Sequence, residues 1–130
     1  MVSDANTFKK FLKQDLKVPE KNIISLQDGW ALCKEIISSF KHLKDNKDYK
    51  KGQVGIIIFY AGHGTWAKIP KGWQNWETNS GYIEVLCPSD IGYGNLELEG
   101  IPDQMILALL DQISEAQGNN IVRNLNLFQN

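Results

Sequence analysis

The sequence predicts a single α/β domain in which helices cover both faces of a mainly parallel sheet. Segments with helical and strand-like hydrophobic patterns alternate along the chain, as expected when crossover helices join successive strands. The strand predicted at residues 54–60 is apolar on both faces, which is typical of a central strand buried between helices. A length of 130 residues is sufficient for one modest core, so we expect one domain over residues 1–130.

An amphipathic helix is predicted from Asp4 to about Leu16. Apolar side chains recur along this segment at helical spacing, and lysines occupy the opposite face. Pro19 follows the predicted end of the helix, where proline is common. A short strand is then predicted from Asn22 to Leu26.

A second helix is predicted from about Trp30 to Lys44, with Asp28 as its N-cap. Its apolar face includes Cys33, which we expect to be a core residue. The polar residues 44–52 are predicted to form the loop that leads into the strand at 54–60.

Residues 65–80 have no clean periodicity and are predicted to form a long functional loop. This loop carries Trp66, Trp73 and Trp76, which would either line a peptide groove or cover the edge of the sheet. A strand is predicted next, at residues 82–86.

A third helix is predicted to begin at Pro102 and to end at Gly118, because proline suits a first helical turn and glycine suits a C-terminus. The final strand pattern, at residues 120–125, is weakened by Arg123 and Asn124. The chain opens on a helix and ends on this weak pattern, so both ends look truncated.

Composition excludes several classes of partner. The formal net charge is −1, which gives no bulk attraction to nucleic acid or to an anionic membrane. No apolar run approaches the length of a membrane span, and the N-terminus has no signal-peptide pattern. Two cysteines do not make a disulfide framework, so we expect a reducing, cytoplasmic location.

No metal site or cofactor is expected from the sequence. It contains no cluster with metal-ligand spacing and no glycine-rich phosphate loop. A small-molecule-binding α/β domain, which would need such a loop after a strand, is therefore a minor alternative.

Residues 56–64 (IIIFYAGHG) place His63 between two glycines at the end of an apolar strand. Glycine allows the backbone to turn sharply and to approach a ligand closely, so this arrangement presents an imidazole at the edge of the sheet. An isolated Gly-His-Gly is more often structural than catalytic. A catalytic role for His63 as a general base requires a nucleophile elsewhere in the chain.

Three segments resemble the caspase-like cysteine peptidase domain, and most closely the metacaspase-like, caspase-domain proteins of fungi. They are residues 52–64, residues 83–90 (IEVLCPSD) and residues 100–103 (GIPD). Further pieces fit the same pattern in the same order: residues 2–5 (VSDA), Val18-Pro19, Trp73 and residues 118–121 (GNNI). The resemblance covers nearly the whole chain.

The resemblance implies a three-layer α/β/α sandwich and a Cys–His dyad endopeptidase that acts on a peptide or protein substrate. In that reading His63 deprotonates a cysteine thiol and later protonates the leaving amine, and the Gly64 N–H helps to form the oxyanion hole. Metacaspase-type relatives cleave after Arg or Lys, whereas animal caspases cleave after Asp.

The chain departs from the family at the nucleophile. The family's cysteine lies on a later strand, in an Asp-x-Cys-x-Ser-Gly type motif. Alignment through residues 118–121 puts the expected Asp near Asn126 and the expected Cys near Phe128, and no cysteine follows Cys87. The family's first strand, which precedes Ser3, is also missing, so the chain resembles an interior piece of the domain.

We therefore expect this polypeptide to be inactive by the family mechanism. One alternative is a non-catalytic pseudo-peptidase, a regulatory interaction module that pairs through its sheet edge with a full-length relative or with itself. The other is a fragment with no function of its own.

Asp90 and Trp66 are candidate substrate-binding residues. Asp90 and Asp103 are loop carboxylates near the expected site and are suited to pair with a basic P1 side chain. Asp103 follows Pro102 directly, however, which also suits the N-terminus of the third helix.

The remaining candidates have structural interpretations. Cys87 is expected to be a small, half-buried residue at a turn rather than a substitute nucleophile. His42 lies among lysines on the polar side of a helix, so we expect it to be solvated.

Overall fold

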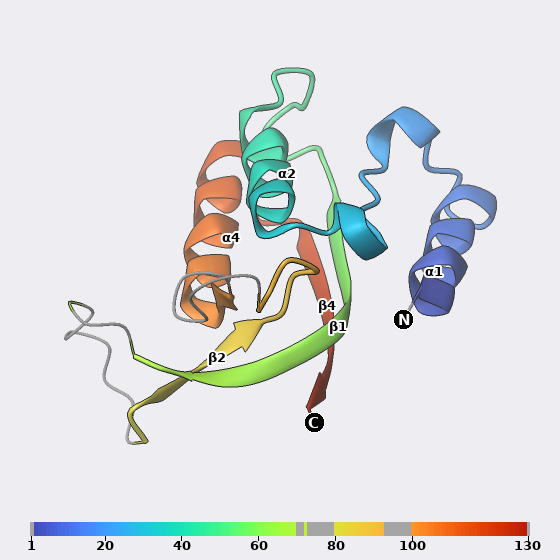
Figure 1. Cartoon of the computed structure of the whole chain (residues 1–130). Coiled ribbons are helices and arrows are strands. Elements are labelled where there is room, and N and C mark those ends of the chain that lie inside the picture. Colours follow the sequence, from blue (N-terminus) through green and yellow to red (C-terminus); the bar gives the residue numbers. More distant parts are fainter. Residues whose placement is uncertain (1, 70–71, 73–79, 93–99, 130) are drawn as a thin grey trace.

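The computed structural model describes residues 2–69, 72, 80–92 and 100–129. These residues form a mixed α/β fold with a four-stranded sheet in the order β3-β2-β1-β4 (Figure 1). The strands are β1 (Ile56–Lys68), β2 (Tyr82–Leu86), β3 (Ile101–Pro102) and β4 (Ile121–Gln129).

The sheet formed by the described strands is mixed, and the predicted mainly parallel arrangement is not confirmed. The first part of β1 pairs with β4 in parallel, whereas its last five residues pair with β2 antiparallel. β2 also pairs with β3 antiparallel. The reason is that β1 does not end at Tyr60 but continues to Lys68, which gives β2 an adjacent partner on the edge away from β4.

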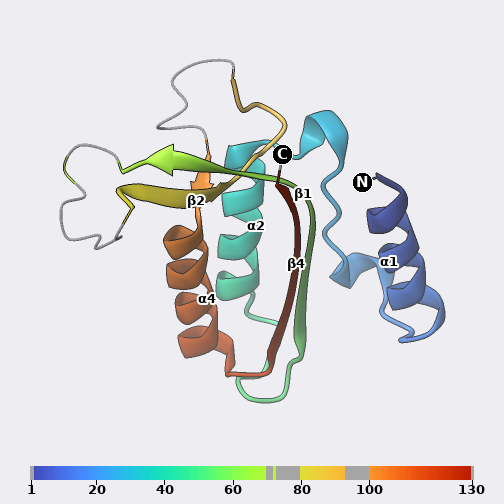
Figure 2. The ribbon, with the colours of Figure 1, turned by 90° about the horizontal axis from the view of Figure 1, so that it is seen from below.

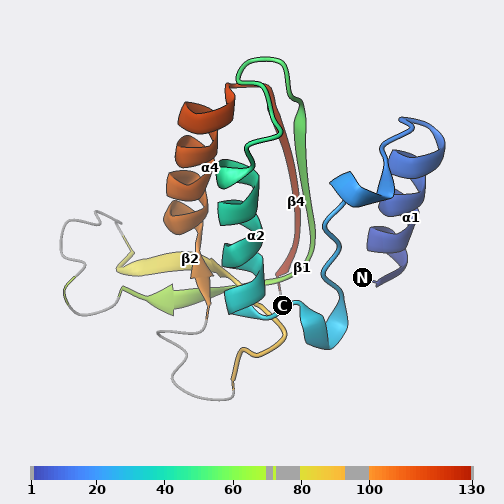
Figure 3. The same cartoon turned by 90° about the horizontal axis from the view of Figure 1, so that it is seen from above.

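Three helices are present among the described residues: α1 (Val2–Gln14), α2 (Cys33–Asp45) and α4 (Asp103–Gln117). Helices α2 and α4 lie side by side and contact each other, and α1 lies on the other side of β1 and β4 (Figures 2 and 3). No helix in the described part of the chain is long and apolar enough to cross a membrane.

The hydrophobic core lies between the sheet and the pair of helices α2 and α4. Ile101 and Ile113 are almost completely buried, at 1% and 0% exposure. Side-chain alternation along β1 directs Ile56, Ile58 and Tyr60 toward this core. The other members of the buried cluster are Phe40, Leu86, Ile106 and Leu109.

The opposite face of β1 is only partly covered. Ile57 is 41% exposed. Phe59, on the same face, stacks on Phe8 of α1 with a distance of 4.4 Å between ring centroids. This ring pair attaches α1 to the sheet.

A buried amide links the two core helices. The side-chain Nε2 of Gln117, which is 5% exposed at the end of α4, donates to the carbonyls of Leu43, Lys44 and Asn46 at 2.9–3.1 Å. These carbonyls belong to the last turn of α2 and the residue after it, where helical carbonyls have no partner within the helix. Gly118 ends α4 with φ 103°, as the sequence predicts.

Three further sequence predictions need correction. The strand predicted from Asn22 to Leu26 does not form: a 3₁₀ turn covers Glu20–Asn22, and the residues that follow pair with no described strand. The second helix begins at Cys33 rather than near Trp30, and Asp28 lies in a separate 3₁₀ turn instead of capping the helix. The final strand extends to Gln129 despite Arg123 and Asn124, because β1 provides a long parallel partner.

Candidate functional site

His63 lies in the part of β1 where the strand changes partners. It is exposed, whereas Gly62 before it is buried and Gly64 after it is half-buried. Alternation along the strand places His63 on the face opposite Tyr60, away from the core between the sheet and helices α2 and α4. The structure therefore presents the imidazole to solvent.

The backbone of β4 brings the expected nucleophile position next to His63. In the parallel register of β1 and β4, His63 is paired with Phe128, Gly64 with Gln129 and Ala61 with Asn126. Phe128, near which the sequence alignment expects the cysteine, is therefore the neighbour of His63 on the adjacent strand.

Cys87 adjoins His63 on the other side. Its backbone N–H donates to the His63 carbonyl at 2.9 Å, one position beyond the last residue of β2. The thiol is half-buried, and burial raises its pKa above the ordinary value. A thiol that is held protonated at neutral pH is a poor nucleophile, which favours the structural interpretation of Cys87.

The Tyr60 hydroxyl lies close to the backbone carbonyls of both His63 and Cys87. Its oxygen lies 3.1 Å from the His63 oxygen and 3.2 Å from the Cys87 oxygen. Burial, followed by the charge of an ionised Cys87, raises the pKa of Tyr60 to about 12. The hydroxyl therefore keeps its proton and donates at neutral pH.

Gly62 makes room for this tyrosine. A Cβ atom at position 62 would lie 2.5 Å from the Tyr60 hydroxyl oxygen and 2.6 Å from the ring carbon that bears it. These separations are far below van der Waals contact, so the Tyr60 arrangement requires glycine at this position. The Tyr60–Gly62 relationship was not predicted from the sequence; a tyrosine two residues before a glycine on one strand face was the available signal.

Asp90 has a structural partner. Its Oδ1 accepts a hydrogen bond from the Cys33 N–H at 3.0 Å, at the N-terminus of α2. The Ser89 N–H donates to the Ala31 carbonyl at 2.9 Å, so the turn after β2 is fixed to the start of that helix. Burial and the nearby Asp90 carboxylate both raise the pKa of the Cys33 thiol.

The structure separates Trp66 from His63. Trp66 is 54% exposed and pairs with Glu84 of β2. It lies three positions after His63, so strand alternation places the two side chains on opposite faces of β1. Trp73 and Trp76 lie outside the described residues, and Asp103 is exposed in the first turn of α4.

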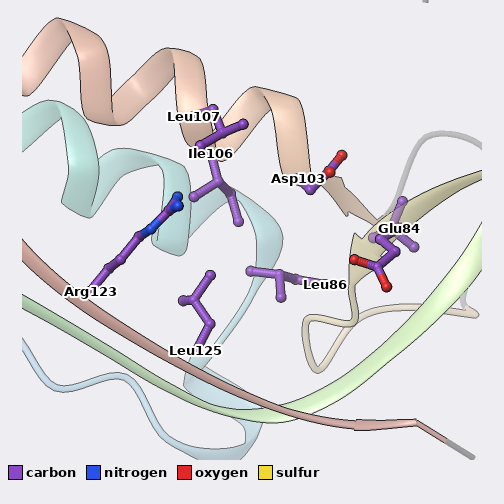
Figure 4. A pocket seen from close by; sticks show the side chains of 8 residues that line it. Glu84, Leu86, Asp103, Ile106, Leu107, Arg123 and Leu125 are labelled. Atoms are coloured by element: carbon purple, nitrogen blue, oxygen red, sulfur yellow. The ribbon is translucent and has the colours of Figure 1, made fainter. Parts of the chain in front are cut away.

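A pocket of about 320 Å³ opens between α4 and strands β2 and β4 (Figure 4). Its apolar wall includes Leu86, Ile106 and Leu125, and Arg123 extends into it from β4. Glu84 and Asp103 lie on the β2 side of the pocket. These strand residues belong to the core-facing side of the sheet, so the pocket is not part of the His63 site, and the sequence analysis did not predict it.

His42 is exposed on α2, and Cys33 packs against the core, both as predicted. Among the described residues, there is no group of three or more His, Cys, Asp or Glu side chains that could bind a metal ion. Comparison of the chain with protein-family models, with curated proteins and with solved structures gave no match.

Proposed function

We propose that the chain is a caspase-like cysteine-type endopeptidase domain in which His63 occupies the general-base position. We further propose that the chain itself does not hydrolyse peptides, because Phe128 stands at the nucleophile position. The observation that carries the proposal is the register between β1 and β4, which pairs these two residues. The motif alignment that places the expected cysteine near Phe128 is independent of the pairing between β1 and β4.

The chemistry explains why position 128 decides activity. In a Cys–His peptidase the imidazole removes the thiol proton, and the sulfur attacks the substrate carbonyl to form an acyl-enzyme. The imidazolium then gives its proton to the leaving amine, and water hydrolyses the thioester. A phenylalanine supplies neither a proton to transfer nor an electron pair to attack, so His63 alone contributes little to the rate.

The arrangement of helices is compatible with a caspase-like three-layer sandwich. Helix α1 lies on one side of β1 and β4, and helices α2 and α4 lie on the other (Figure 2). His63 lies near the end of the part of β1 that pairs in parallel with β4, which suits a site at the carboxyl end of that parallel pair.

A gain-of-function experiment tests the proposal. Fluorogenic peptides with Arg, Lys or Asp at P1 are offered to the wild-type chain and to Phe128→Cys, Phe128→Cys/His63→Ala and Leu127→Cys. We expect turnover only from Phe128→Cys, because a cysteine at 127 is one residue out of register with His63. Turnover by the wild-type chain that disappears in His63→Ala would refute the claim that the chain is inactive. Turnover by Phe128→Cys that persists without His63 would refute the assignment of the base.

A second candidate function is supported by the backbone of β1. The Ile56 N–H donates to the carbonyl of Asn120, the residue just before β4. The backbone N–H and C=O groups of successive strand residues point to alternate edges of the strand. Ile57, Phe59 and Ala61 therefore direct their N–H and C=O groups away from β4. Pairing with β2 begins only at Gly64, so no described strand pairs with this edge.

An open edge of this kind pairs with an extended strand from another chain. A related caspase-like protein that supplies such a strand would make this chain a regulatory interaction module. Light scattering coupled to size-exclusion chromatography tests the self-pairing form of this idea. Pairing predicts a mass that rises with concentration and that Ile57→Pro, which removes one edge N–H, returns to the monomer value. A monomer at every concentration would argue strongly against self-pairing.

A further inference from the structure

Arg123 is a charged residue on the core-facing side of β4. Strand alternation places Arg123 and Leu125 on the same face as Ile121, which packs against the hydrophobic core. The ion pairs among the described residues involve other side chains, and none of them includes Arg123. A guanidinium that extends into an apolar pocket without an acidic partner is suited to bind a carboxylate from outside the chain.

The pocket that Arg123 enters keeps opposite charges apart. Figure 4 shows Arg123 on one side of the pocket, and Asp103 of α4 and Glu84 of β2 on the other. The side chains that lie between these charged groups in the view, Leu86 and Ile106, are apolar. The pocket therefore offers a cation at one end, carboxylates at the other and an apolar surface between them.

Asp103 is able to receive a cationic group. It is the first residue of α4, and its Oδ1 accepts the Gln104 N–H at 2.8 Å. Its side chain is exposed, so the second carboxylate oxygen, Oδ2, is accessible from the pocket. An ammonium group placed there would form a charge-assisted hydrogen bond.

The size of the pocket restricts the ligand to a small molecule. Its volume of about 320 Å³ is at the lower end of the range for ligand pockets, which is about 300–1,000 Å³. Two of its lining residues, Arg123 and Leu107, are exposed, so the pocket is open to solvent and a ligand has a path into it. The lining fits a small molecule with a carboxylate at one end, an ammonium at the other and an apolar body.

We propose that this pocket binds a short apolar peptide with both termini free. The C-terminal carboxylate of the peptide pairs with Arg123, its N-terminal ammonium pairs with Asp103, and its apolar side chains lie on the wall that includes Leu86 and Ile106. A carboxylate without an amine fits less well, because the pocket also holds the carboxylates of Asp103 and Glu84. The proposal does not depend on the proposed function, since none of these residues belongs to the His63 site.

NMR titrations of the ¹⁵N-labelled wild-type chain with Leu-Leu and Leu-Leu-Leu test the proposal. We expect saturable shifts centred on residues 84–86, 103–107 and 123–125, with a Kd on the order of 0.1–10 mM for ligands of this size. N-acetylation or C-terminal amidation of the peptide should each weaken binding by about three- to tenfold. The absence of saturable shifts at these residues would overturn the proposal. Equal affinity for a peptide blocked at both ends, or for free leucine, would also overturn it.

Two variants assign the ends of the peptide. Arg123→Gln should weaken binding of Leu-Leu by about three- to tenfold and leave binding of the amidated peptide unchanged, because that peptide has no carboxylate to lose. Asp103→Asn should weaken binding of Leu-Leu and leave binding of the N-acetylated peptide unchanged. Asparagine keeps an oxygen that accepts the Gln104 N–H, so the start of α4 is preserved.

Asp111→Asn, at an exposed position of the same helix, is the matched control and should leave every affinity unchanged. Losses in Arg123→Gln or Asp103→Asn that are equal for free and blocked peptides would overturn the proposal, because they would indicate general disruption of the pocket rather than loss of a charge pair.

Discussion

His63 of β1 and Phe128 of β4 are paired in a parallel register, so position 128 lies next to the histidine on the neighbouring strand. The histidine is exposed and is held between two strands. Its other neighbour, Cys87, carries a thiol whose pKa is raised by burial. Under the proposed function, the imidazole of His63 would therefore have no thiolate beside it at neutral pH.

Gly62→Ala should destabilise the fold through Tyr60. A Cβ at this position would lie 2.5 Å from the phenol oxygen, so the tyrosine must move away from the His63 and Cys87 carbonyls. We expect the free energy of unfolding to fall by about 1–3 kcal/mol in urea titrations. Gly29→Ala is the matched control, because a Cβ there meets nothing within 4 Å. Equal stability of the two variants would contradict the packing described at Gly62.

Gln117→Leu should be among the most destabilising single substitutions on α4. It leaves three carbonyls at the end of α2 without the amide that now donates to them. Buried acceptors left without a donor cost about 1–3 kcal/mol, which thermal and urea unfolding will detect. Gln112→Leu, at an exposed position of the same helix, provides the control. Similar effects at positions 117 and 112 would show that the amide contact has little energetic value.

Asp90→Ala should weaken α2 rather than substrate binding. The carboxylate accepts the first N–H of that helix, and losing such an acceptor typically costs about 1 kcal/mol. In the Phe128→Cys background we expect KM for a peptide with Arg at P1 to stay within about twofold of the parent. A large rise in KM with unchanged stability would instead restore Asp90 as a substrate-binding residue.

Stability should fall in alkaline solution. Burial raises the pKa of Tyr60 from the ordinary 10.0 to about 12, so the folded protein retains a proton that the unfolded chain releases. The free energy of unfolding therefore declines as the pH rises above about 10, and this contribution is fully present below that value. Urea titrations at pH 8 and pH 11 should show a smaller loss for Tyr60→Phe than for the wild-type chain. An equal loss would indicate that Tyr60 does not contribute.

The sequence alone predicts the helices and strands whose signals lie in neighbouring residues. The apolar run before His63 predicted a central strand, and the Gly118 signal marked the end of α4 correctly. Both depend on residues close together in the chain. Hydrophobic periodicity also placed Cys33 on the core side of its helix.

The errors arose where pairing between distant segments decides the structure. Residues 65–68 lack a strand pattern but pair with β2, and β4 continues through polar residues because β1 lies beside it. Residues 23–26 have a strand pattern, yet they pair with no described strand. No short stretch of the sequence indicates which distant segment a strand will pair with.

The assignment of the candidate site residues stays a prediction. The glycines around His63 indicate where an imidazole would be presented, and motif alignment places the expected cysteine near Phe128. The contacts of Tyr60 depend on a side chain that reaches across Gly62 to two backbone carbonyls. Arg123 and Glu84 line a pocket that forms only when β2, β4 and α4 come together.

The most direct test of the central claim is the thiol pKa of Phe128→Cys, obtained from the pH dependence of its alkylation by iodoacetamide, with the modified cysteine identified by mass spectrometry. Burial raises the pKa of Cys33 and Cys87, so both should react slowly near neutral pH. The account predicts that the pKa of the introduced thiol lies about one unit or more below its value in Phe128→Cys/His63→Ala, because a neighbouring imidazolium stabilises the thiolate. The same pKa in both proteins would contradict the account, since His63 would then not serve a nucleophile at position 128.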